Sequence, residues 1–179
     1  MENKTKWSID QTHSEIAFKV RHLMIANVKG EFKTFDANIH TNGTDFSTAN
    51  IDLWIDASSV NTNDAKRDEH LKSADFFDVE NYQKIMFVSD SIEKSNIENH
   101  YNLGGNLTIK GITNKIKLDV EYGGTIKDPW GNEKTGFTVT GKIVRKDWEL
   151  NWNATLDLGG VMVSDEVSII CDVELLRQV

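Results

Sequence analysis

The sequence is poor in cysteine and proline, with one residue of each among 179. A single cysteine excludes an intramolecular disulfide, and it excludes zinc sites that need several cysteine ligands. Small secreted proteins held together by disulfides are therefore excluded as a class. The lone proline, Pro129, lies in the loop-like segment Asp128–Asn132, where its missing backbone N–H costs nothing.

Positive charge is also scarce, because 20 lysines and arginines face 28 aspartates and glutamates, for a net charge of −8. Nucleic-acid binding needs a concentrated basic face, so this balance argues against a nucleic-acid partner. Met1–Trp7 is polar, and no stretch approaches the roughly 18–20 apolar residues of a membrane span. We expect the chain as given to be cytoplasmic, or periplasmic if a signal peptide has been removed.

Apolar residues occur in alternation with polar ones instead of in long runs. In Glu15–Arg21, for example, Ile16, Phe18 and Val20 share one face, which predicts a half-buried strand. In the segment 30–41 the alternation of apolar and polar residues changes phase near Lys33, which predicts a bulge or bend there. The predicted strands are 15–21, 30–41, 50–57, 84–91, 101–110, 115–122, 135–144 and 166–175.

About eight short strands, each with one apolar face, predict an all-β, antiparallel, closed or nearly closed barrel, because closure removes unpaired edges. The length suits a single domain, residues 1–179. Residues 62–78 are rich in charge and predict one or two short helices, with Thr62 or Asn63 as N-cap and Asp64 in the first turn. The doublet Phe76–Phe77 is expected to line the barrel mouth, to form a lid or to plug one end.

An eight-stranded barrel is either filled by side chains or holds one small ligand, and alternation alone does not distinguish these cases. Because the inward positions are apolar, any enclosed ligand must be apolar too. The predicted ligand-binding residues are the inward apolar positions and the phenylalanine doublet: Phe18, Val20, Phe32, Leu53, Ile55, Phe76, Phe77, Phe87, Leu107, Ile109, Leu118, Val120, Val139 and Ile169.

Two basic residues are candidates for contact with a polar head group. Arg67 lies on the predicted helix, where a guanidinium could meet a phosphate or carbonyl, and His22 follows a strand whose inward phase includes Val20. The alternative for Arg67 is that it and Asp68 pair with neighbours and hold the helix on the barrel.

Catalytic and metal-binding motifs find little support. The sequence has no nucleophile elbow, phosphate-binding loop or dinucleotide fingerprint, and its five histidines lack metal-ligand spacing. Cys171 falls on the apolar phase of the last strand and is interpreted as a small core residue, while His13 and Ser14 are expected to cap a turn. We predict no catalytic residue, metal or cofactor.

An ordered set of motifs extends from Trp7 to Leu175. Its parts are WSIDQTHS (7–14), Gly30 with Phe32 and Phe35, RDEHLKSADFFD (67–78), GNLTIKG (105–111), RKDW (145–148) and VSDEV (163–167). In these residues and their order the chain resembles the YceI-like family of lipocalin-like barrels. One departure is Glu149, which follows Trp148 where the family usually has a glycine.

The resemblance implies a protein that binds, sequesters or carries a long-chain hydrophobic molecule, a polyisoprenoid or an isoprenoid quinone, inside the barrel. Binding of a fatty acid or fatty amide is the alternative within this class. An enzyme that acts on a bound isoprenoid lipid through Asp68 or His70 is the alternative from another class. The expected partner is the apolar small molecule, and the resemblance favours a homodimer.

Overall fold

The computed structural model describes residues 3–154 and 162–178. These residues form strands and short helices in the order β1 (Lys4–Ile9), β2 (Glu15–His22), β3 (Ala26–Phe32), β4 (Phe35–Asn42), β5 (Asp45–Asp56), η1 (Ala57–Ser59), β6 (Val60–Asn61), α1 (Ala65–Lys72), β7 (Lys84–Lys94), β8 (His100–Ile109), β9 (Ile112–Lys127), β10 (Glu133–Val144), η2 (Arg145–Trp148) and β11 (Val163–Arg177).

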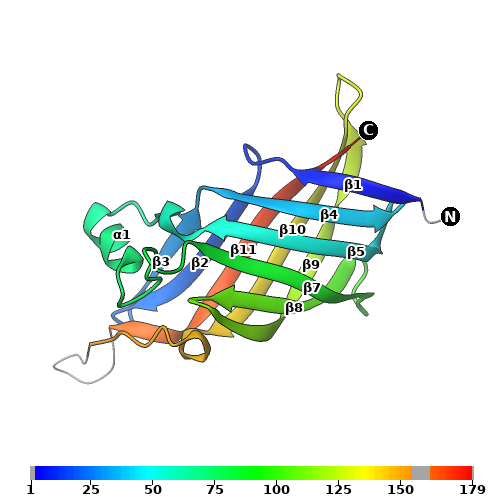
Figure 1. Ribbon diagram of the computed structural model, residues 1–179. Helices are drawn as coiled ribbons and strands as arrows, with labels where there is room; N and C mark the ends of the chain where they lie inside the picture. Colours follow the sequence, from blue (N-terminus) through cyan, green and yellow to red (C-terminus); the bar gives the residue numbers. More distant parts are fainter. Residues whose placement is uncertain (1–2, 155–161, 179) are drawn as a thin grey trace.

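Eight antiparallel strands close into a barrel (Figure 1). Their order around the ring is β1–β4–β5–β7–β8–β9–β10–β11, and pairing of β1 with β11 completes it. The predicted all-β antiparallel barrel is thereby confirmed, and its interior is the core of the molecule.

The seam of the barrel lies along β11, which pairs with two consecutive strands on the same side. The C-terminal part of β11 pairs with β1, for example Ile9 with Leu175, and its N-terminal part pairs with β2, for example Phe18 with Ile169. From β2 the sheet continues through β3 to β6, which follows β5 directly along the chain after η1. One side of β11 is therefore paired first by β1 and then by β2, which are linked by the turn of residues 10–14.

All eight predicted segments contain strands of the structure. One of them is divided in two, and two strands were not predicted, β1 and the two-residue β6. The segment 30–41 breaks at Lys33 and Thr34 into β3 and β4, which confirms the bend predicted near Lys33. Strand β1 was not predicted, because one of its inward positions is the buried Thr5, so its apolar alternation is only two residues long.

The predicted helical region contains the single α-helix of the described chain, α1, followed by turns. Its N-cap is Asp64, whose carboxylate accepts a hydrogen bond from the Arg67 backbone N–H at 3.1 Å. The predicted caps, Thr62 and Asn63, were wrong by one or two residues. Asn63 adopts a positive φ of 62°, and the Thr62 side chain is engaged with Asp68 instead.

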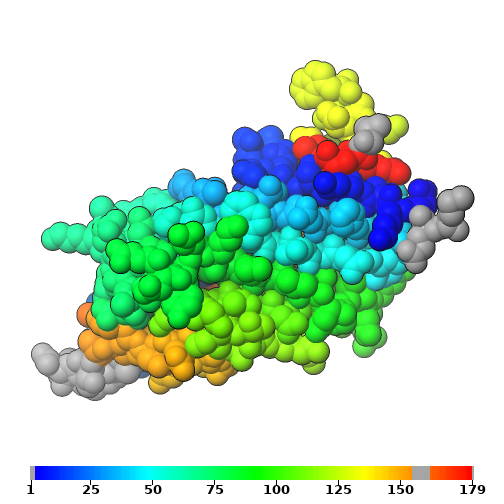
Figure 2. Space-filling view, viewed as in Figure 1, coloured from blue at the N-terminus to red at the C-terminus, as the bar shows by residue number. Residues whose placement is uncertain are grey.

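The two ends of the barrel differ in outline. Helix α1 and the segment leading to β7 lie over one end, while the β9–β10 hairpin projects from the body at the other (Figure 2). None of the helices in the described residues has the length and apolarity required to cross a membrane.

Candidate functional site

The barrel encloses a cavity of about 240 Å³ with an almost entirely apolar wall. This volume lies just below the range of about 300–1,000 Å³ that is usual for ligand pockets, and far above the space that one water needs. Because the wall offers water almost no hydrogen-bond partner, the cavity favours an apolar occupant. The wall consists of Ile9, Ile16, Ala17, Phe18, Phe32, Ala37, Ile39, Phe46, Ala49, Ile51, Leu53, Ile55, Phe77, Ile85, Phe87, Ile92, Leu103, Leu107, Ile109, Ile116, Leu118, Val120, Phe137, Val139, Ile143, Arg145, Leu150, Val167, Ile169, Cys171, Val173 and Leu175.

The structure brings the predicted apolar residues together on this wall, with two exceptions, Val20 and Phe76. Val20 lies near the end of β2 and is only half-buried. Phe76 is buried, but it packs outside the wall against His70, at 5.1 Å between ring centroids. Contact of the other residues with a ligand stays a prediction.

Two interior aromatic rings occupy space that glycines leave open. The Phe18 ring lies over Gly30 of the neighbouring strand, and the Phe87 ring lies over Gly105. A Cβ at either glycine would collide with the ring. The glycines therefore let both rings lie against the sheet, which keeps part of the interior open.

Aromatic side chains from four different strands close the end of the barrel opposite α1. The Phe46 ring lies 5.0 Å from Trp7, 4.8 Å from Phe137 and 6.5 Å from Tyr122, measured between centroids. The fully buried Trp7 indole donates a hydrogen bond to Thr41 Oγ1 at 2.9 Å. We call this group of Trp7, Phe46, Tyr122 and Phe137 the aromatic end. Because each ring belongs to a paired strand, this closure is part of the sheet itself.

The end covered by α1, the helix end, is held by side-chain hydrogen bonds around Thr62. Asp68 Oδ1 accepts bonds from the Thr62 backbone N–H at 2.8 Å and from its hydroxyl at 2.6 Å. Arg67 donates from Nε to Thr62 Oγ1 and from Nη2 to the Thr62 carbonyl, both at 2.8 Å. Arg67 and Asp68 thus tie the helix to the barrel, which is the alternative weighed from the sequence.

A second contact of the helix end joins α1 to the segment after η2. His70 Nε2 lies 2.8 Å from Asp75 Oδ2, and its ring meets Trp152 edge-on at 4.6 Å. Phe76 packs 5.5 Å from the same indole. Helix α1 has no fully buried residue, but its partly buried Leu71 packs against the core.

The structure places neither predicted head-group residue on the cavity wall. The Arg67 guanidinium is directed to Thr62, and His22 lies at the end of β2, where it pairs with Ala26 and Val163.

One charged residue does lie on the described wall, Arg145, the first residue of η2, and it was not predicted. Its side chain is 4 % exposed. The guanidinium donates from Nε to Ser164 O at 2.9 Å, from Nη1 to Leu150 O and, at 2.9 Å, to Trp152 O, and from Nη2 to Val163 O at 3.2 Å. The motif RKDW contained it, but a charged residue beside Lys146 gave no signal of burial.

The residue after this motif, Glu149, has a φ of 57° and ends η2 in the left-handed region. That conformation is easy for glycine and unfavourable for glutamate. A glycine at this place, as the resemblance to the family implies, would make the same turn without strain, whereas the glutamate strains it.

Cys171 faces the cavity from β11, between Ile16 and Val139 of the adjoining strands. Burial raises the pKa of its thiol to about 11. The thiol is therefore protonated at neutral pH and serves as a small apolar wall residue, as its position in the sequence predicted.

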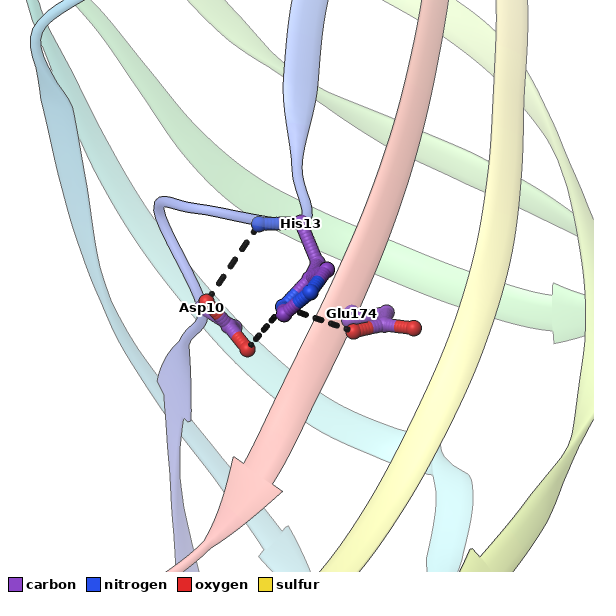
Figure 3. A group of neighbouring side chains, drawn as sticks. All are labelled: Asp10, His13 and Glu174. Carbon is purple, nitrogen blue, oxygen red and sulfur yellow. Dashed lines mark hydrogen bonds and ion pairs between the residues drawn. The ribbon is translucent and has the colours of Figure 1, made fainter.

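Outside the barrel, Asp10, His13 and Glu174 form a group whose ligand-type atoms lie within 4.8 Å of one another (Figure 3). Asp10 Oδ2 lies 2.9 Å from His13 Nδ1 and 3.6 Å from the Lys134 ammonium. Partial burial raises the pKa of Asp10, but hydrogen bonds from His13 and Thr12 outweigh this and hold it below its usual value. Because a lysine cation already adjoins Asp10, we interpret the group as a clasp between the β1–β2 turn and β11.

The β1–β2 turn has a second attachment to β11 through Ser14. Its hydroxyl accepts a hydrogen bond from the Glu174 backbone N–H at 3.0 Å. Within the turn, the backbone N–H groups of Thr12 and His13 are capped by Asp10, and not by the predicted His13 and Ser14.

Comparisons with known proteins agree with this architecture. The family model described as YceI-like domain matches residues 7–175. A UPF0312 protein of Staphylococcus aureus (strain MSSA476) is 41% identical over 171 residues, covering 95% of this chain and 96% of its own length. The YCEI protein of Campylobacter jejuni is 35% identical, with a TM-score of 0.77 over 89% of this chain and 90% of that one. A domain from Saccharophagus degradans, described as polyisoprenoid binding, shares 15% identity and has a TM-score of 0.67 over 96% and 98% of the two chains.

Proposed function

Because this chain belongs to the YceI-like family, we propose that it binds one long-chain hydrophobic molecule inside its barrel and sequesters or carries it. The cavity of about 240 Å³ with its apolar wall is the observation that carries the proposal. Burial of a hydrocarbon chain releases about 0.8 kcal/mol per CH₂, so even a partly enclosed chain has a large driving force.

The preferred ligand is a polyisoprenoid or an isoprenoid quinone. A narrow cavity between β-strands accommodates a flexible unsaturated chain better than a bulky fused ring system. The Saccharophagus degradans neighbour described as polyisoprenoid binding, which has the same fold, supports this preference. A fatty acid or fatty amide fits the same wall, so the ligand class is decided by experiment.

We place the entrance for the ligand at the helix end. Opening the aromatic end would require rings on four paired strands to separate. Helix α1 has no fully buried residue; it packs on the core through the partly buried Leu71 and is otherwise attached by the contacts of Thr62 and His70. Segments with few buried apolar contacts open at low free-energy cost. Phe77, which lies on the wall and packs on Phe32 at 5.6 Å, would then be part of the gate.

Binding is favoured over catalysis because the candidate acid–base residues are engaged elsewhere. Asp68 accepts two hydrogen bonds from Thr62, and His70 is paired with Asp75. Neither residue lies on the cavity wall, where a bound isoprenoid would be held.

The test is organic extraction of the purified protein, followed by mass spectrometry of the extract. Prenyl or acyl species at about one molecule per chain support the proposal. A clean extract, together with no thermal shift when prenyl lipids are added, would overturn it. A variant with a charge on the outer face, Asn106→Asp, is the control, because Asn106 is exposed on the same strand as the wall residue Leu107.

A further inference from the structure

The turn between β2 and β3, residues 23–25, exposes apolar side chains to solvent. Met24 is 54% exposed and Ile25 is 78% exposed, and Leu23 beside them is half-buried. Single exposed apolar residues are ordinary on a protein surface, but these lie together at the end of a hairpin. We call residues 23–25 the β2–β3 tip.

The backbone of the β2–β3 tip is strained, so folding alone does not account for its residues. Leu23 has a φ of 52° and Met24 a φ of 62°, which places two consecutive residues in the left-handed region. Turns with two such residues usually contain asparagine and glycine, which adopt this conformation at low cost. A conflict of this kind between side chain and backbone is expected at functional sites.

The hairpin that carries the tip is basic, although the protein has a net charge of −8. Residues 16–30 contain Lys19, Arg21 and Lys29 and no aspartate or glutamate. Lys19 and Lys29 are direct cross-strand partners, an arrangement in which like charges repel. Lys29 lies 3.4 Å from Glu15, whereas Lys19 and Arg21 have no ion pair within the described part of the chain.

Carboxylates on the strand beside this hairpin already have cations of their own. At the start of β11, which pairs with β2, Asp165 lies 3.3 Å from the Lys146 ammonium, and Glu166 lies 3.4 Å from the Lys142 ammonium. The positive charge of the hairpin is therefore available to an anionic partner.

The tip lies at the helix end of the barrel, because the β2–β3 hairpin reaches the same end as α1 (Figure 1). The Leu23 backbone N–H donates a hydrogen bond to the Met162 carbonyl at 2.8 Å, one residue before β11 begins. Arg145 of η2 bonds both the Val163 carbonyl and the Trp152 carbonyl, and the Trp152 ring packs on α1. The tip, η2 and α1 are thus joined at the end where we place the entrance for the ligand.

A second exposed apolar residue lies on the β9–β10 hairpin, at the opposite end, in a different electrostatic setting. Trp130 there is 83% exposed. The Asp128 carboxylate accepts hydrogen bonds at 2.9 Å from the backbone N–H groups of Trp130 and Asn132, so a negative charge is held in the turn itself. Approach to an anionic surface is therefore opposed at this hairpin and favoured at the β2–β3 tip.

We propose that the β2–β3 tip docks the protein on a lipid bilayer that carries anionic head groups. Met24 and Ile25 enter the interface between head groups and acyl chains, and Arg21, close behind them, meets the lipid phosphates. Because salt screens charges beyond about 10 Å, the cations of the hairpin act at the surface while distant carboxylates do not. Docking of this kind goes beyond the proposed function and turns the entrance of the barrel toward the membrane.

The test is flotation of the purified protein with vesicles, without any added ligand. Vesicles of equal parts phosphatidylglycerol and phosphatidylcholine are expected to bind the protein, and vesicles of phosphatidylcholine alone to bind much less. Raising the salt from about 0.1 M to about 1 M should weaken binding to the anionic vesicles about tenfold or more. Failure to bind the anionic vesicles, or equal binding to both compositions, would overturn the docking. The proposed function is tested separately by lipid extraction and does not depend on this result.

Matched substitutions on the two hairpins locate the contact. The double variant Met24→Ser with Ile25→Ser is expected to bind anionic vesicles about tenfold more weakly, and Arg21→Gln about fivefold more weakly. Trp130→Ser and Lys127→Gln make corresponding changes on the β9–β10 hairpin and are expected to leave binding unchanged. All five residues are exposed, so the variants are expected to fold. Controls that weaken binding as much as the variants of the tip would contradict the proposal.

The rival occupant of the tip is a second copy of this chain, which sedimentation velocity without vesicles detects. Docking on a bilayer predicts the same sedimentation coefficient for the unaltered protein and for the double serine variant. An unaltered dimer that the double variant converts to a monomer would overturn the docking and assign the tip to a contact between copies.

Discussion

The two ends of the barrel are closed by different means. At the aromatic end, Trp7, Phe46 and Phe137 belong to paired strands and pack ring to ring. At the helix end, α1 has no fully buried residue and is attached by polar contacts centred on Thr62 and by the partly buried Leu71. The same chain thus relies mainly on apolar burial at the aromatic end, and more on exchangeable hydrogen bonds at the helix end, where we place the entrance.

This difference shows how one barrel can be both stable and able to admit a ligand. Apolar burial contributes most of the stability of a domain, whereas a hydrogen bond between polar groups contributes about 1 kcal/mol because water replaces it when it opens. Substitutions at the aromatic end are therefore expected to change stability, and substitutions at the helix end to change exchange of the ligand.

The largest effect is expected where neither end is involved, in the middle of the wall. Leu107→Asp places a carboxylate among apolar residues, so it loses the packing of leucine and buries a polar group. We expect unfolding free energy to fall by about 5 kcal/mol and ligand to be lost. Denaturant unfolding measures the first and lipid extraction the second. A Leu107→Asp protein as stable as Asn106→Asp would mean that the interior is open to water.

A matched pair of substitutions tests the comparison itself. Phe46→Ala at the aromatic end removes a ring that packs on three others. We expect it to lower the free energy of unfolding by about 4 kcal/mol and to change the ligand exchange rate little. Phe77→Ala at the helix end removes a half-buried ring. We expect it to lower the free energy of unfolding by about 2 kcal/mol and to speed ligand exchange.

Stopped-flow transfer of a fluorescent prenyl lipid, together with thermal unfolding, measures both properties of this pair. The distinction between the ends fails if Phe46→Ala speeds transfer more than Phe77→Ala does.

Cys171 provides a reporter of access to the wall that depends on pH. Because burial raises its pKa to about 11, the reactive thiolate is rare at pH 8 and increases about tenfold with each pH unit until the pH passes 11. Iodoacetamide labelling of the folded protein should follow this rise, slow down with bound ligand and speed up in Phe77→Ala. A labelling rate that levels off near pH 9 would contradict the burial of Cys171.

A smaller effect is expected from loosening the attachment of α1. Asp68→Asn weakens the two hydrogen bonds from Thr62 and should lower the free energy of unfolding by about 1–2 kcal/mol. Hydrogen exchange should increase in α1 and stay unchanged in β1 and β4 at the aromatic end. Uniform acceleration through all strands would show instead that α1 unfolds only together with the barrel.

Much of the fold was predictable because antiparallel strands with one buried face carry their own signal. The alternation in 50–57, for example, follows directly from one side of β5 facing the core. Strand β1 escaped prediction because Thr5 is buried, and burial of a hydroxyl depends on tertiary neighbours that the local pattern does not contain.

The wall of the site was predictable for the same reason, since its residues are the inward faces of the strands. Arg145 was not, because its partners are carbonyl groups at Leu150, Trp152, Val163 and Ser164, and these meet only after η2 and the start of β11 are in place. A lone basic residue in a polar motif indicates an exposed position until such an arrangement is known.

The central claim, that the barrel holds one long-chain hydrophobic molecule, is tested most directly by native mass spectrometry of the protein after incubation with a prenyl lipid. The account predicts one lipid per chain for the unaltered protein and for Asn106→Asp, and none for Leu107→Asp. An unaltered protein that stays free of lipid, or a Leu107→Asp protein that carries as much, would contradict it.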